Sequence, residues 1–182
     1  MSDPKEFAQR AINSLIITAT NTHQACVTEL RAIPESEGGW SPEKSAQKQG
    51  FFVGIFDITG ECVAQAYCGS MPPGRNGELF DSAQGKAANL FTLRRKDSRV
   101  ISTWEKRHLV GVQGGAILIM IAGEMYALVG AGLPSQMDHL IMTDTMRRSA
   151  TSGASLLDQM SRYTSVVKQR ANVLGILQQA AA

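Results

Sequence analysis

The segments FFVGIFDI (residues 51–58) and CVAQAYC (residues 62–68) decide the fold of this chain. Only the turn Thr59-Gly60-Glu61 separates them, and two apolar runs joined by so short a connection predict an antiparallel β-hairpin. Apolar residues occupy both faces of the first segment, which is typical of a strand covered on both sides. We expect helices on one face of this hairpin, and for the other face the pattern suggests a partner subunit.

A second hairpin is expected within GGAILIMIAGEMYALVGAG (residues 114–132), where apolar runs at 116–122 and 125–131 flank the turn. Between the two hairpins, the sequence predicts a helix of about 18 residues from near Glu78 to Arg95. Antiparallel hairpins separated by helices are typical of the α+β class.

Helices are also expected on either side of the hairpins. Asp3 and Pro4 favour a helix start, an apolar stripe at helical spacing follows, and the helix should end before Pro34. Further along, Ser135 follows a proline and opens another helix, with Asp138 spaced for a capping box.

The chain divides into residues 1–153, one domain with a polar insertion loop at 34–50, and residues 154–182. The latter segment has apolar residues at three–four spacing and predicts an extra C-terminal amphipathic helix. Such a helix packs on its own domain or on a copy of itself, and both alternatives stay open.

Composition restricts the class of protein. The chain has 182 residues, a net charge of +2 and 43% hydrophobic residues, which is typical of a globular domain. No apolar run approaches the ~18 residues of a membrane span, and the N-terminus lacks a signal-peptide pattern. Three cysteines without metal-site spacing fit a reducing compartment, so we expect a cytoplasmic protein with no membrane partner.

A basic segment between Lys86 and Arg107 includes Arg94, Arg95 and Arg99. Cations at a helix end complement the helix dipole, which is the simpler interpretation of these residues. The alternative is an anion site for carboxylates or phosphates. Because no aromatic residues interleave with the charges as a stacking platform would require, we expect no nucleic-acid partner.

The three histidines show no metal-binding pattern. His23 lies on the apolar stripe of the first helix, where a hydrogen-bonded core residue is the simpler interpretation and an axial ligand the alternative. His108 precedes a predicted strand, and His139 lies just inside a helix. No two histidines are four residues apart and the cysteines do not pair with them, so we expect no dedicated metal site.

No catalytic motif stands out either. The sequence contains no G-x-S-x-G, and the acidic residues near element ends have ordinary structural interpretations. Lys86 lies among small residues, and we interpret it as a structural lysine that reaches solvent. The alternative is an acid–base role beside a carboxylate.

Several short motifs carry a family resemblance. In chain order they are Asp57-x-x-Gly60, Val63-Ala64, Ala83-x-x-Lys86-Ala87, Gly114-Gly115, Gly123-Glu124 and Asp138. With these motifs, residues 5–146 resemble the GlcG/HbpS-like family, a haem-binding or haem-degrading group also found as the C-terminal domain of PduO corrinoid adenosyltransferases. The resemblance implies a profilin-like fold with an antiparallel sheet of about five strands flanked by helices. It also implies dimers to octamers, and binding of haem or a corrinoid, redox sensing, or a link to small-acid catabolism.

The chain departs from the family at three places. It has Tyr67-Cys68-Gly69-Ser70 where the family has Arg-Met-Asp-Gly, it lacks the proline after Gly114-Gly115, and it has Gly130-Ala131-Gly132-Leu133 for Gly-x-Ser-Gly. These residues lie at strand ends and connections, where binding residues gather. We therefore expect the resemblance to hold better for the fold than for the ligand.

Three functional hypotheses follow. The first is a homo-oligomeric small-molecule-binding protein whose ligand is haem or another tetrapyrrole. The second is a non-catalytic oligomeric scaffold or regulatory protein, and the third is a small enzyme that acts on organic acids. We name no catalytic residue and favour a non-enzymatic role. The cofactor-binding candidates are two possible axial ligands, a lysine and three arginines that would hold propionates: His23, His139, Lys86, Arg94, Arg95 and Arg99.

Overall fold

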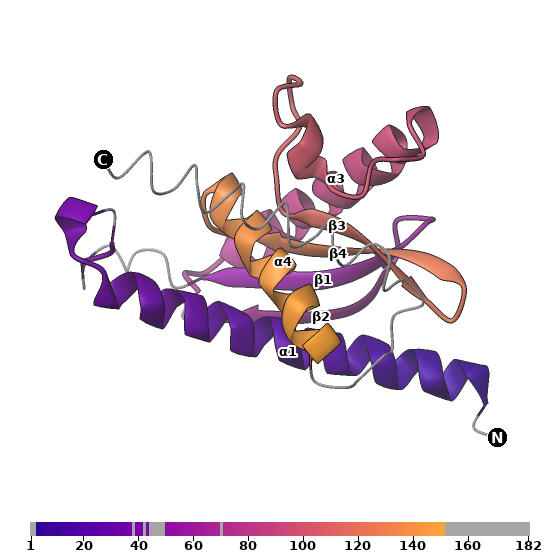
Figure 1. Ribbon diagram of the computed structural model, residues 1–182, viewed down its shortest axis with the longest axis horizontal. Coiled ribbons are helices and arrows are strands. Elements are labelled where there is room, and N and C mark those ends of the chain that lie inside the picture. Colours follow the sequence, from indigo (N-terminus) through magenta and orange to yellow (C-terminus); the bar gives the residue numbers. More distant parts are fainter. Residues whose placement is uncertain (1–2, 38, 42, 44–49, 70, 152–182) are drawn as a thin grey trace.

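One antiparallel sheet with the strand order β2-β1-β4-β3 lies at the centre of the molecule (Figure 1). This computed structural model describes residues 3–37, 39–41, 43, 50–69 and 71–151. The strands are β1 (Phe51–Asp57), β2 (Cys62–Cys68), β3 (Ala116–Ile121) and β4 (Glu124–Ala131). Strands β1 and β2 pair with each other, as do β3 and β4, so both predicted hairpins and the α+β class are confirmed.

The expectation of about five strands is wrong for the described residues, which form a four-stranded sheet. The segment before β3 contributes an isolated bridge between Ser102 and Ile117, and a hydrogen bond from the Leu118 amide to the Ile101 carbonyl. A short 3-10 helix, η2 (Thr103–Lys106), begins directly after this bridge. Because η2 turns the chain away from the sheet edge, the pairing stops before a fifth strand forms.

Three long helices accompany the sheet in the described residues: α1 (Pro4–Ala32), α3 (Arg75–Lys96) and α4 (Ser135–Thr151). Helix α1 begins as expected, because the Asp3 side chain accepts a hydrogen bond from the Lys5 amide at 3.0 Å. It ends where Ile33 adopts an extended conformation, directly before Pro34.

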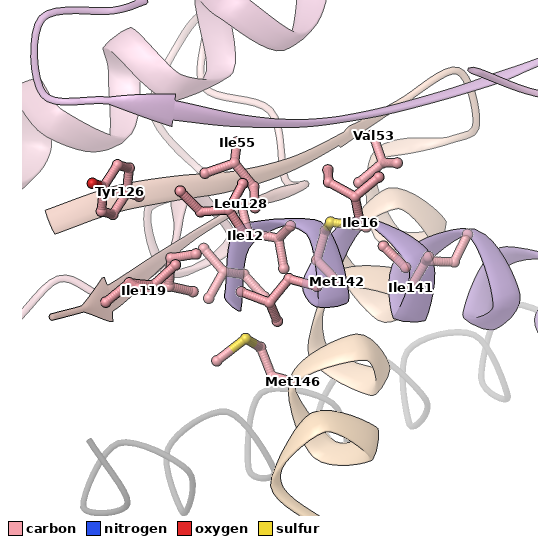
Figure 2. Packing of buried hydrophobic residues seen from close by; sticks show 14 of the residues in the cluster. Ile12, Ile16, Val53, Ile55, Ile119, Tyr126, Leu128, Ile141, Met142 and Met146 are labelled. Carbon is pink, nitrogen blue, oxygen red and sulfur yellow. The ribbon is translucent and has the colours of Figure 1, made fainter. Parts of the chain in front are cut away.

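The helices cover both faces of the sheet. On one face, isoleucines and methionines of α1 and α4 pack against alternate residues of β1, β3 and β4 (Figure 2). On the other face, Leu79, Leu90 and Phe91 of α3 pack against Phe52 and the other strand residues that alternate with those of the first face. The suggestion that a partner subunit covers this second face is therefore wrong, since α3 of the same chain does so.

Parts of the predicted organisation lie outside the described residues. These include most of the predicted C-terminal helix at 154–182 and positions 38, 42 and 44–49 of the insertion loop. Within that loop, Trp40 is buried and its amide donates to the Leu30 carbonyl, which ties the loop to the end of α1. The helices of the described part of the chain lack the combined length and apolar character that crossing a membrane requires.

Candidate functional site

Lys86 and Asp138 form an ion pair inside the protein, where α3, β4 and α4 meet. The Lys86 Nζ lies 2.6 Å from Asp138 Oδ2, and the two side chains are 5% and 1% exposed. The same ammonium donates to the Gly130 carbonyl of β4 at 2.9 Å, while Asp138 Oδ1 accepts from the Leu133 amide at 3.1 Å. The prediction that Lys86 reaches solvent is thus wrong. Its side chain turns into the protein from the buried face of α3.

Gly115 leaves the space that this ion pair occupies. Its φ is +120°, and a Cβ atom there would lie 2.9 Å from Lys86 Nζ, 2.9 Å from Asp138 Cβ and 2.7 Å from the Gly130 carbonyl oxygen. The Gly130 amide in turn donates to the Gly115 carbonyl at 2.8 Å. A glycine is therefore required both by the backbone conformation and by the close approach of the pair.

The start of α4 is built differently from the expected capping box. The Ser135 hydroxyl accepts a hydrogen bond from the Gly114 amide, and the Asp138 carboxylate turns toward Lys86. Burial raises the pKa of Asp138 to about 7, and the adjacent Lys86 ammonium acts in the opposite direction. This arrangement ties three elements together in the core, and neither group is placed to meet a substrate in solution.

His139 is fully buried on α4 and stacks on Trp104. The two rings are nearly parallel, with an interplanar angle of 8° and a centroid distance of 5.3 Å. The Arg107 guanidinium lies 4.3 Å from the Trp104 ring centroid. Burial, and then the charge of Arg107, lower the pKa of His139 to about 3, so the imidazole is neutral. Within the described residues neither of its nitrogens has a hydrogen-bond partner.

His23 occupies a similar environment on α1. Its ring stacks on Phe51 at 4.6 Å, and burial lowers its pKa to about 4. The core position predicted for His23 is confirmed. The expected hydrogen bonds are not found, because both ring nitrogens lack a partner among the described residues.

The three arginines of the basic segment lie around the C-terminal end of α3 and have local partners. Arg94 donates to the Val100 carbonyl at 3.0 Å, and Arg95 donates to the Thr92 hydroxyl at 3.1 Å. Arg99 pairs with Asp97 at 3.0 Å. These contacts support the simpler interpretation, in which the cations stabilise the helix end and the turn after it.

The six sequence candidates do not converge on one place. His23 and His139 lie on α1 and α4, which cover one face of the sheet, whereas α3 and the arginines lie on the other. Lys86 is enclosed with Asp138. In the described part of the chain, no group of three or more His, Cys, Asp and Glu side chains is arranged to hold a metal ion. The six candidates therefore do not form one common site within the described residues.

A cavity of about 330 Å³ lies elsewhere, between the first turns of α1, the start of β2 and the β3–β4 turn. We call it the α1–hairpin cavity. Its lining combines apolar side chains with a few polar ones: Pro4, Lys5, Ala8, Gln9, Ile12, Val63, Ile121, Ala122, Glu124 and Tyr126. The sequence did not indicate this cavity, because the lining comes from three segments far apart in the chain. The one signal is Tyr126, whose hydroxyl is a polar group within the apolar run at 125–131.

The polar groups of the α1–hairpin cavity have defined roles. The Tyr126 hydroxyl donates to Glu124 Oε2 at 3.1 Å. Burial, and then the nearby Glu124 carboxylate, raise the pKa of Tyr126, so its phenol stays protonated. Lys5, in the first turn of α1, also lines the cavity. The lining of the cavity thus includes one lysine and one hydrogen-bonded carboxylate.

Comparison with known proteins finds no matching family model, no matching curated protein and no matching solved structure. The likeness to the GlcG/HbpS-like family therefore remains a prediction from the sequence motifs.

Proposed function

We propose that this chain is a small-molecule-binding protein whose ligand occupies the α1–hairpin cavity. The composition of the lining carries this proposal. Buried apolar side chains of Ile12 and Ile121 form the floor, and the exposed side chains of Lys5, Gln9 and Glu124 form the rim. Ligand sites typically have volumes of about 300–1,000 Å³, mostly apolar walls and a few polar groups that orient the ligand.

The charges around the cavity favour a small organic acid that also carries a hydroxyl or amino group. The Lys5 ammonium and the positive end of the α1 dipole attract a carboxylate. The Glu124 carboxylate can accept a hydrogen bond from the ligand, as it does from Tyr126. A volume of about 330 Å³ is at the small end of the range, which suits such an acid better than a macrocycle.

We expect mandelate, an acid with a hydroxyl group and an apolar ring, to raise the thermal unfolding midpoint of the full chain saturably. Gln9→Trp should abolish this rise, because the indole fills the cavity mouth. Gln24→Trp is the matched control, since Gln24 is an exposed residue of the same helix that does not line the cavity. A rise that survives Gln9→Trp, or a complete lack of a rise with wild type, contradicts the proposed site.

Haem or another tetrapyrrole is the second candidate ligand. It is supported by the family resemblance and by the ring nitrogens of His23 and His139, which have no hydrogen-bond partner among the described residues. Both histidines are buried, so an iron could reach either one only after the ring stacking on Phe51 or Trp104 opened.

A hemin titration tests this second candidate. If a histidine ligates the iron, a saturable Soret shift should appear with wild type and be lost in His23→Ala or in His139→Ala. Equal Soret shifts in wild type and in both variants would exclude ligation by these two histidines. Absence of a saturable shift would remove haem from the candidates.

Two wider expectations belong to the same proposal. Helices on both faces of a four-stranded sheet, in the order hairpin, helix, hairpin, support the profilin-like fold that the resemblance implies. The three cysteines form no disulfide among the described residues, which fits the cytoplasm that we propose as the location of the protein.

A further inference from the structure

Strand β2 forms one edge of the sheet in the described part of the chain. Strand β3 forms the opposite edge, and the Ile101 carbonyl and the bridge to Ser102 cover part of it. Strand β2 pairs with β1 on its inner side, and the described residues place no further strand on its outer side. An open edge exposes a row of main-chain hydrogen-bonding groups to other chains.

The register of the sheet identifies these groups. The Gly130 amide donates toward β3, and main-chain groups along a strand point alternately to its two sides. The main-chain N–H and C=O groups of the odd-numbered residues of β4 therefore point to β1. Because Val129 pairs with Gly54, the main-chain groups of the even-numbered residues of β1 point to β4. It follows that the odd residues of β1 bond to the even residues of β2, as in Val53 with Ala66. The N–H and C=O groups of Gln65 consequently face outward.

The same alternation turns the main-chain groups of Tyr67 outward.

The side chains of β2 itself give this edge little protection. Natural edge strands are usually shielded by charged residues, prolines or bulges. Strand β2 (CVAQAYC) has no charged residue and no proline, and its register shift lies at the start of the strand, opposite Ile55 and Phe56. Tyr67 remains 38% exposed beside the edge, although its ring packs edge-on against Phe52 at 5.1 Å. The centre of the strand is therefore uncharged and partly apolar.

We propose that the outer edge of β2 binds a second copy of this chain, antiparallel and around a twofold axis at Gln65. The strand reads almost the same in both directions from this residue, with Ala64 and Ala66 on either side. Pairing around the axis places Gln65 opposite the partner's Gln65 with their outward main-chain groups aligned. The two four-stranded sheets then become one continuous sheet, and the interface is identical on both subunits.

Side chains are compatible with this pairing. Ala64 lies opposite the partner's Ala66, so no bulky groups collide. Glu61, the acidic residue directly before the strand, would lie opposite the partner's Gly69, so like charges do not meet across the axis. Self-complementarity selects a second copy over an unrelated partner.

Charge substitution at Gln65 tests the interface, with the mass of the full chain measured by light scattering after size exclusion. Wild type should have twice the 19.6 kDa of one chain, or an even multiple of it. Gln65→Lys and Gln65→Glu should each halve the mass, because two like charges then face each other on the axis. Mixing the two variants should restore it, since opposite charges meet. Gln113→Lys, a matched change in an exposed loop, should leave the mass unchanged.

A wild-type monomer, or an oligomer that neither Gln65 variant reduces, would overturn the proposal. So would a mixture of the two variants that fails to recover the wild-type mass. Circular dichroism of each variant shows whether the fold is retained. As a second measurement, Gln65→Cys in a Cys62→Ser and Cys68→Ser background should form a disulfide-linked dimer on mild oxidation, and Gln113→Cys in the same background should not. All these measurements are made without ligand, so their outcome is independent of the proposed binding function.

Discussion

Lys86→Met should destabilise the protein by about 3–5 kcal/mol at neutral pH, because it leaves the Asp138 carboxylate buried without its counter-charge. Urea denaturation followed by circular dichroism measures this loss. Lys106→Met is the control, since Lys106 lies 4.0 Å from Asp97 in a partly exposed pair and should cost at most about 1 kcal/mol. A second variant, Lys86→Met with Asp138→Leu, removes both charges and should recover part of the loss.

The loss in Lys86→Met should also depend on pH. Burial already raises the pKa of Asp138 above its ordinary value of 3.8, and removal of Lys86 raises it further. A carboxyl group whose pKa is higher in the folded state binds more protons when folded. The stability that such a group contributes to the fold is therefore fully present below its unfolded-state pKa and is lost as pH rises through its folded-state pKa. The variant should lie closer to wild type at about pH 5 than at about pH 8. A pH-independent difference would contradict a charged, buried Asp138 as the cause.

Gly115→Ala should have the second large effect, a loss of about 3 kcal/mol or more in the free energy of unfolding. A non-glycine residue at a φ of +120° is strained by about 1–3 kcal/mol. The added methyl group would also press on Lys86 and Asp138, and overpacking in a core typically costs about 1–3 kcal/mol.

Gly60→Ala separates these two contributions. Gly60 also has a positive φ, +89°, but a Cβ there would have no neighbour within 4 Å. This control should therefore show the conformational part of the loss alone. Equal losses at both positions, measured by the same urea titration, would show that the Lys86–Asp138 pair does not need the space at Gly115.

The elements that the sequence predicted well are those with a local pattern. Each hairpin has two apolar runs joined by a short turn, and the start of α1 is set by Asp3 and Pro4. The fifth strand was an expectation from the family resemblance, whereas the turn of η2 limits the pairing of the segment before β3 to one bridge. Local patterns therefore gave the class of fold, and tertiary contacts decided the number of strands.

The site residues depend on contacts between distant segments, and for this reason they were harder to predict. Lys86 and Asp138 are 52 positions apart, and nothing in their spacing shows that α3 and α4 bring them together across the end of β4. The small residues around Lys86 were visible in the sequence, but they indicate room beside the lysine without showing that its ammonium points inward. The α1–hairpin cavity likewise exists only after α1 has packed near the β3–β4 turn.

The most direct test of the proposed binding function is an NMR titration of the ¹⁵N-labelled full chain with mandelate, followed through the backbone amides. We expect saturable shifts that gather at Lys5, Gln9, Ala122 and Glu124 around the α1–hairpin cavity and disappear in Gln9→Trp. Shifts that gather instead around the arginines after α3, or amides that do not move at all, would contradict it.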